Sequence, residues 1–267
     1  MMGFEPIPRF SRERILSPLR LPFRHIGVQA NLTRGLAQTK RFSIYDQLSQ
    51  RSRNFFDGRQ LTDANKIQRE ENLMGKLDGK KVAILVTDGF EQVEMTKPRE
   101  ALEEAGAGTK IVSPKSGQIQ GMNHANKGDK FDVDIPLDEA QPEEFDALMI
   151  PGGLMNPDEL RATPDALEFT KHFFQEGKPV AAICHAPWVL IDAGVARGRK
   201  LTSWEHIQTD VKNAGGNWIN EEVVVENGLV TSRKPDDIPA FNKKMIEEFC
   251  EGRHARQTQF AGAGLET

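Results

Sequence analysis

The sequence predicts an α/β fold in which a mostly parallel β-sheet is covered by helices on both faces. Two observations lead to this prediction. After residue 80, short continuous apolar segments, typical of strands buried on both faces, alternate with segments of helical periodicity. An Asn-Gly pair between two valine-containing runs then predicts a β-hairpin. Repeated strand–helix units favour parallel strands joined by crossover helices.

Four strands are expected in the parallel part of the sheet. Each is a short apolar run that ends at polar or turn-forming residues, and they span 82–86, 109–112, 145–150 and 179–183. The small β-hairpin spans residues 223–231, with its turn at Asn227-Gly228.

Three helices are expected between and after these strands. The first begins at Thr96, with Pro98 in its first turn, and ends at Gly106. The second begins at 163–165 (Thr-Pro-Asp) and ends at Gly177. The closing helix begins at 236–237, where two aspartates suit the positive end of a helix. Its apolar stripe consists of Ile238, Phe241, Met245 and Phe249.

Composition narrows the class of protein. Of 267 residues, 38% are hydrophobic and 28% charged, which excludes collagen-like, low-complexity and disulfide-stapled chains. No run of 18 apolar residues occurs, so no bilayer span is expected. A net charge of −4 gives no whole-chain argument for binding nucleic acid or an anionic membrane. Two cysteines cannot form a disulfide framework, which favours a reducing compartment and a cytoplasmic protein.

The charge is unevenly distributed along the chain. Residues 1–73 hold 13 Lys and Arg against 7 Asp and Glu, a charge of +6, whereas the remainder carries −10. This basic extension is expected to be disordered, and three interpretations of it stay open: translation that begins at Met74, an organelle-targeting segment within 6–42, or a disordered basic arm. The acidic part is expected to form one α/β domain over 76–252, followed by a flexible tail over 253–267.

The expected strands place three loops at one edge of the sheet, where α/β folds bind ligands. These loops are 87–91, 151–153 and 184–187. Cys184 directly follows a buried strand and precedes a helix with Pro187 in its first turn, which is the position of an exposed nucleophile in hydrolases. The positive end of that helix would lower the thiol pKa. His185 is adjacent and could act as base or acid.

Two further groups complete the predicted site. The N–H groups of Gly152 and Gly153 could stabilise an oxyanion, because glycines let the backbone approach a ligand closely. Glu91 lies in the first loop, where a protonated carboxyl could donate a hydrogen bond to the thiolate. Glu94 is expected at the surface.

Other interpretations of these residues remain open. Cys184 could be a small buried apolar side chain, as most free cysteines are. Cys250 in the closing helix is expected to be packed or inertly exposed. His124, Trp188 and Trp204 could line the pocket or serve the core or surface. No metal site is expected, because the six histidines are scattered and neither Cys-x-x-Cys nor His-Glu-x-x-His occurs.

Five segments in order resemble the PfpI family of the class I glutamine amidotransferase-like superfamily, whose members include intracellular cysteine peptidases and glyoxalase III or deglycase enzymes. The segments are 83–94, 147–153, 177–185, 202–204 and 232–237. The resemblance covers about residues 76–252. It implies a flavodoxin-like three-layer sandwich that self-associates as a dimer or hexamer. It also implies a nucleophile at Cys184, its partner at His185, the supporting carboxyl at Glu91, and an oxyanion site formed by 152–153 and the His185 amide.

The sequence departs from the family pattern at two places. Archaeal peptidases of the family take a third acid from a neighbouring subunit, and here Pro164 stands near that position with Asp165 one step away. A peptidase triad is therefore in doubt. The residue after the histidine is usually Gly and here is Ala186, whose methyl group could narrow the pocket.

Three functions are compatible with this sequence. The first is a cofactor-independent enzyme acting on α-oxoaldehydes, either free or as early adducts on proteins, with a thiohemiacetal at Cys184 and proton transfer by His185 or Glu91. The second is an intracellular cysteine peptidase acting on peptides. The third is a redox-sensing stress protein or chaperone in which Cys184 is oxidised. None of the three requires a metal, a cofactor, nucleic acid or a membrane.

Overall fold

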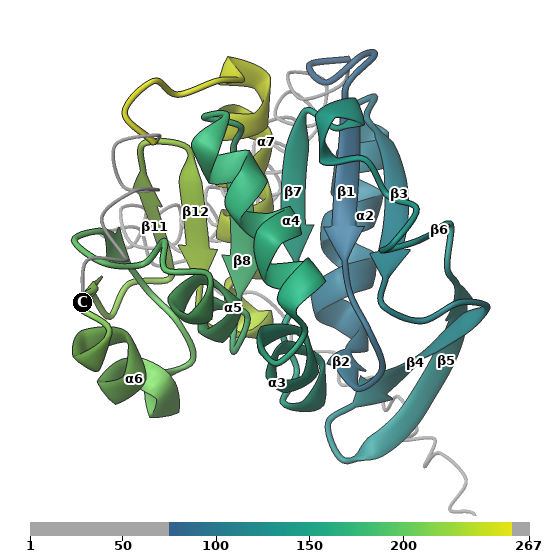
Figure 1. The fold of residues 1–267 in the computed structure, drawn as a ribbon, viewed down its shortest axis with the longest axis horizontal. Coiled ribbons are helices and arrows are strands. Elements are labelled where there is room, and N and C mark those ends of the chain that lie inside the picture. Colours follow the sequence, from purple (N-terminus) through teal and green to yellow (C-terminus); the bar gives the residue numbers. More distant parts are fainter. Residues whose placement is uncertain (1–74, 258–267) are drawn as a thin grey trace, which may run out of the picture. The chain divides into compact units, whose positions relative to one another are not determined.

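The computed structural model describes residues 75–257, and the predictions for residues 1–73 and for the end of the tail lie outside these residues. A seven-stranded sheet runs through the centre in the order β11-β12-β8-β7-β1-β3-β6 (Figure 1). All neighbours are parallel except the β11–β12 pair. The strands are β1 (Lys81–Leu85), β3 (Gly108–Ser113), β6 (Ile135–Pro136), β7 (Ala147–Ile150), β8 (Val180–Ile183), β11 (Val223–Glu226) and β12 (Leu229–Ser232).

Helices cover both faces of this sheet. On one face lie α2 (Gln92–Glu104) and α7 (Ile238–Glu251); on the other lie α3 (Met155–Arg161), α4 (Pro164–Gln175) and α5 (Pro187–Asp192) (Figure 1). Strand β1 shows why two cores form. Val82 and Ile84 are buried in the cluster with α2 and α7, whereas Ala83 and Leu85 are buried in the cluster with α4 and α5. Alternate side chains of a strand point to opposite faces, so a doubly covered strand is apolar throughout.

Three predicted elements are confirmed. Helix α4 begins after Thr163 and its chain turns at Gly177, which has a φ of 66°. All four residues of the predicted stripe on α7 are buried. The hairpin turn has positive φ angles at Asn227 (48°) and Gly228 (83°), as a two-residue turn of this sequence requires. The hairpin forms the edge of the main sheet, since β12 also pairs with β8.

The predicted start of the first helix is wrong. Helix α2 begins at Gln92, four residues before Thr96, and Pro98 lies inside it. The Thr96 hydroxyl donates to the Gln92 carbonyl within the helix (3.0 Å), so it does not cap a helix start. The buried side chain of Met95 anchors the additional turn against the sheet. This shift decides which acidic side chains face the interior.

The sequence did not predict several smaller elements. A hairpin of β4 (Gln118–Asn123) and β5 (Asn126–Asp132) pairs with β2 (Phe90–Glu91), and β9 (Lys200–Leu201) pairs with β10 (Asn217–Trp218). Helix α6 (Gln208–Asn213) and the 3-10 helices η1 (Pro142–Glu144), η2 (Glu205–Ile207) and η3 (Pro235–Asp237) complete the fold. Their sequences are short or polar, which leaves little periodicity to detect. Within residues 75–257, no helix has the length and apolar character that a membrane crossing requires.

Candidate active site

The structure brings the three predicted loops together at the carboxyl ends of β1, β7 and β8. Gly152 shows how closely they meet. A Cβ atom on Gly152 would lie 2.5 Å from Cys184 Cβ and closer still to Glu94 Oε2. A Cβ on Gly153, whose φ is 85°, would lie 2.5 Å from the Glu91 nitrogen. Both glycines are therefore required by close approach of neighbouring backbone and side chains.

Cys184 occupies a sharp turn between β8 and α5. Its φ of 64° is a left-handed conformation that costs a non-glycine residue about 1–3 kcal/mol. The surrounding backbone holds this conformation: the Cys184 N–H donates to the Ser232 carbonyl (3.0 Å), and the Trp204 N–H donates to the Cys184 carbonyl (2.8 Å). A strained cysteine at a strand–helix turn has the geometry of a nucleophile elbow.

The carboxyl group next to the thiol belongs to Glu94, and the expectation that Glu94 lies at the surface is wrong. Its side chain is fully buried and faces the Cys184 thiol and the N–H groups of Gly152 and Gly153. Neither carboxyl oxygen forms a hydrogen bond of regular geometry within the described residues. A buried acid without a full set of partners at a strained cysteine is a strong candidate for a functional group.

Glu91, which the sequence suggested for this role, lies at the rim of the site. Its carboxylate accepts a hydrogen bond from the His124 N–H (3.0 Å) and lies 3.6 Å from His124 Nδ1. The Glu91 side chain is 13% exposed, and that of His124 is 88% exposed. The structure therefore brings Glu91 to a loop of the β4–β5 hairpin, whereas Glu94 supplies the carboxyl that faces the sulfur.

Burial sets the protonation of the thiol and the carboxyl. It raises the pKa of Glu94 to about 8, so this carboxyl carries a proton at neutral pH. Burial, followed by the charge of Glu94, also raises the pKa of Cys184, and the N–H groups of Gly153 and His185 oppose this rise. The prediction that the N-terminal end of helix α5 lowers the pKa of the Cys184 thiol is therefore wrong in direction. Helix α5 has only six residues, and Pro187 in its first turn offers no N–H group.

The ring of His185 completes the cluster around the sulfur. Its Nδ1 atom lies 3.2 Å from Cys184 Sγ. Burial, and after it the charge of His206, lowers the pKa of His185 to about 4, so the ring is neutral at pH 7 and its unprotonated nitrogen can accept a hydrogen bond. Trp188 and Trp204 pack against this ring, with centroid distances of 5.1 and 6.1 Å. Both tryptophans thus line the site.

Asn156, which is not among the site residues predicted from the sequence, holds two of the loops together. The fully buried side chain accepts a hydrogen bond from the Thr87 N–H (2.8 Å) and donates to the carbonyls of Pro151 (2.8 Å) and Gly152 (3.2 Å). It positions the glycine turn relative to β1. An Asn-Pro pair three residues after the glycines was the available signal, since such pairs mark turns.

Among the described residues, one cluster has the composition of a metal site, and it lies away from the thiol. Glu248, Glu251 and His254 offer ligand atoms within 4.8 Å of one another, at the end of α7 and the start of the tail. Exposed Cys250 lies on the same helix. The groups around Cys184 are a thiol, an imidazole and one carboxyl, a set that can perform nucleophilic and acid–base chemistry by itself.

Comparison with known proteins identifies the family. The model of the DJ-1/PfpI family matches residues 80–248, which include Cys184 and the residues described around it. The chain belongs to the DJ-1/PfpI family. The resemblance found in the sequence is thereby confirmed. So is the flavodoxin-like α/β sandwich, since a two-domain protein from Anabaena variabilis with DJ-1/ThiJ/PfpI-like and ferritin-like domains superposes with a TM-score of 0.60 at 32% identity. That match covers 70% of this chain and 50% of the other.

Two curated DJ-1/PfpI relatives carry different names. Protein/nucleic acid deglycase 2 of Escherichia coli is 46% identical over 170 residues, which cover 62% of this chain and 96% of the relative. Putative cysteine protease YraA of Bacillus subtilis is 44% identical over 167 residues, which also cover 62% of this chain and 96% of the relative. Names of both kinds support an enzyme of the DJ-1/PfpI family.

Proposed function

We propose that this protein is a cofactor-independent enzyme that converts α-oxoaldehydes, free or as early adducts on proteins, into 2-hydroxy acids. The observation that carries the proposal is the cluster of three groups at one strained turn. Cys184 Sγ has the neutral His185 ring at 3.2 Å and the protonated Glu94 carboxyl on its buried side. This arrangement places a nucleophile, a proton acceptor and a proton donor around one reacting carbon.

The reaction begins with addition of the thiol to the aldehyde. The Sγ–C1 bond forms as the thiol proton passes to His185, and the aldehyde oxygen then takes a proton to give a thiohemiacetal. Once His185 has returned its proton to that oxygen, the ring removes the proton on C1 and delivers it to C2, which converts the adduct through an enediol into a 2-hydroxy thioester. Water then hydrolyses the thioester, which releases the 2-hydroxy acid and restores the thiol. The net change is addition of one water, with no external oxidant or reductant.

The geometry suggests a role for each group. His185 is neutral and next to the sulfur, so it accepts the thiol proton and can return it. The protonated Glu94 donates a hydrogen bond to the sulfur as negative charge develops there. Protonation also removes the charge of Glu94, which otherwise raises the pKa of Cys184. The Gly153 and His185 N–H groups, which face the sulfur, lie where they could stabilise a developing oxyanion.

A peptidase is the second candidate, because one relative is named as a cysteine protease. The same thiol and N–H groups would form an acyl-enzyme. Asp165, the residue nearest to the expected third acid, is exposed in the first turn of α4. The peptidase reading would therefore need an acid from another subunit to orient His185.

The test is a lactate assay with methylglyoxal, run beside a peptidase assay on the same preparation. We expect lactate formation by the native protein, its loss in Cys184→Ala, and little change in the exposed-cysteine control Cys250→Ser. Peptide hydrolysis that depends on Cys184, without lactate formation, would replace this proposal with the peptidase. Equal lactate formation by Cys184→Ala would refute the assigned nucleophile.

A further inference from the structure

A small cavity lies beside the catalytic turn and has no role in the chemistry described above. Its volume is about 150 Å³, and it is lined by Trp204, Glu205, Asn220, Arg233 and Lys234. Backbone hydrogen bonds tie its walls to the nucleophile. The Trp204 N–H donates to the Cys184 carbonyl, and Ser232, which precedes Arg233, accepts from the Cys184 N–H. Two segments of the cavity wall are therefore bonded through their backbone, or through the preceding residue, to the turn that carries the thiol.

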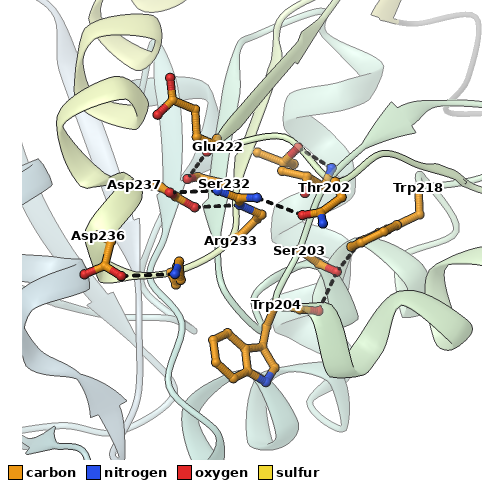
Figure 2. Close-up of polar contacts among 12 residues, drawn as sticks. Thr202, Ser203, Trp204, Trp218, Glu222, Ser232, Arg233, Asp236 and Asp237 are labelled. Carbon is orange, nitrogen blue, oxygen red and sulfur yellow. Dashed lines mark hydrogen bonds and ion pairs between the residues drawn. The ribbon is translucent and has the colours of Figure 1, made fainter.

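Arg233 is held in place at the cavity wall (Figure 2). Its Nε and Nη2 atoms donate to the two carboxylate oxygens of Asp237 at 2.8 and 3.1 Å, and Nη1 donates to Asn220 Oδ1 at 2.7 Å. The Asp237 side chain is 6% exposed, so the pair is fixed from the protein interior. A guanidinium has five N–H donors, and these three bonds leave two for a ligand. A preorganised arginine is well suited to binding a carboxylate.

Lys234 supplies a second positive charge that a ligand anion can contact. Its ammonium lies 3.1 Å from Asp236, whose side chain is 81% exposed. An ion pair this exposed contributes little, so the lysine can exchange Asp236 for a ligand anion at low cost. The acidic residue of the wall, Glu205, has a side chain 63% exposed and can turn toward solvent. The wall thus holds two cations beside three carboxylates, Asp237, Asp236 and Glu205, so a ligand anion would use the two remaining Arg233 N–H groups and would displace Asp236 from Lys234.

Trp204 connects this cationic wall to the reacting centre. Its ring stacks on that of His185, with a centroid distance of 6.1 Å and an interplanar angle of 30°. One face of the cavity is therefore aromatic and can contact methylene groups, while Arg233 and Lys234 meet a charged end. We propose that the cavity binds the carboxylate of a substrate whose reactive aldehyde lies at Cys184, so that the enzyme favours anionic α-oxoaldehydes over neutral ones. This inference rests on the proposed function.

The test compares two matched substrates, 4,5-dioxopentanoate and its neutral methyl ester. We expect kcat/KM to be about tenfold higher for the carboxylate. Lys234→Ala, an exposed change that leaves the Arg233–Asp237 pair intact, should lower this preference about fivefold. Lys243→Ala removes a similarly exposed lysine on α7, paired with Glu247 and outside the cavity, and should keep the preference. Equal kcat/KM for the two substrates, or an unchanged preference in Lys234→Ala, would overturn the proposal.

A binding measurement separates failure of the cavity from failure of the proposed chemistry. The unreactive ketone 4-oxopentanoate and its methyl ester are titrated into the full chain by calorimetry. If no α-oxoaldehyde is converted, tighter binding of 4-oxopentanoate, weakened in Lys234→Ala, would still support the carboxylate site. Equal binding of acid and ester would refute the site whether or not aldehydes are converted.

Discussion

The raised pKa of Glu94 predicts that this one carboxyl makes the folded protein sensitive to pH. An acid whose pKa is higher in the folded than in the unfolded state takes up a proton on folding, so stability is greatest at low pH. It declines as pH rises from the ordinary glutamate value of 4.5 to about 8. Between pH 5 and pH 8 this linkage lowers the free energy of unfolding by about 3 kcal/mol.

Glu94→Gln removes this dependence while keeping the shape of the protonated side chain. The amide cannot ionise, yet its NH2 group can donate to Cys184 Sγ and its oxygen can accept from Gly152 and Gly153. We expect the variant to be more stable than the native protein at pH 8 by about 4 kcal/mol, with a much smaller difference at pH 5. Aldehyde turnover should fall about a hundredfold if the carboxyl exchanges a proton during the reaction.

The assay is urea unfolding at both pH values, with Glu91→Gln as the matched control. Glu91 lies three residues away at the rim, and burial contributes more than the charge of Glu91 to the raised pKa of Glu94, so the Glu91 substitution should leave most of the pH dependence of the native protein in place. If Glu94→Gln and the native protein lose the same stability between pH 5 and pH 8, the buried carboxyl is not protonated in the folded state. The role assigned to its proton would then be wrong.

Three further predictions concern the turn around the thiol. Alkylation by iodoacetamide at pH 7 should be slower at Cys184 than at exposed Cys250, because burial raises the pKa of the Cys184 thiol. Peptide mass spectrometry measures the alkylation of both cysteines, and faster alkylation of Cys184 would contradict the burial argument. Gly152→Ala forces a methyl group against Cys184 Cβ and should destabilise the fold by about 2 kcal/mol. In the control Gly108→Ala, the added methyl group lies 3.8 Å from its nearest neighbour, so the cost should be about 1 kcal/mol or less. Equal shifts of the melting temperature in the two variants would refute the close contact at Gly152. Asn156→Leu removes three buried hydrogen bonds, so it should destabilise the fold by about 3 kcal/mol and lower turnover. A melting temperature and an activity like those of the native protein would show that Asn156 does not position the glycine loop.

Much of the architecture could be predicted because its signals are local. A strand covered on both faces must be apolar at every position, which marked β1, β7 and β8 in the sequence. Their order along the chain placed Cys184 and the glycine turn at the same edge of the sheet. The Asn227-Gly228 turn was predictable because few other residues adopt two successive positive φ angles.

The choice between Glu91 and Glu94 needed the start of α2, and the local signals pointed to the wrong residue. With a helix beginning at Thr96, both glutamates belong to a loop, and neither has a defined face. With the helix beginning at Gln92, Glu94 lies on the same side as Pro98 and Leu102, which are buried against the sheet. Its carboxyl therefore faces inward at the thiol.

The sequence by itself determined the family, the parallel sheet and the turn that carries the cysteine, because hydrophobic patterning and motif spacing act over neighbouring residues. Only the tertiary structure decided which carboxyl meets the sulfur, that the thiol pKa is raised by burial, and that Arg233 stands beside the same turn. These depend on desolvation and on contacts between residues distant in the chain. Such contacts exist only once the sheet and its helices are packed.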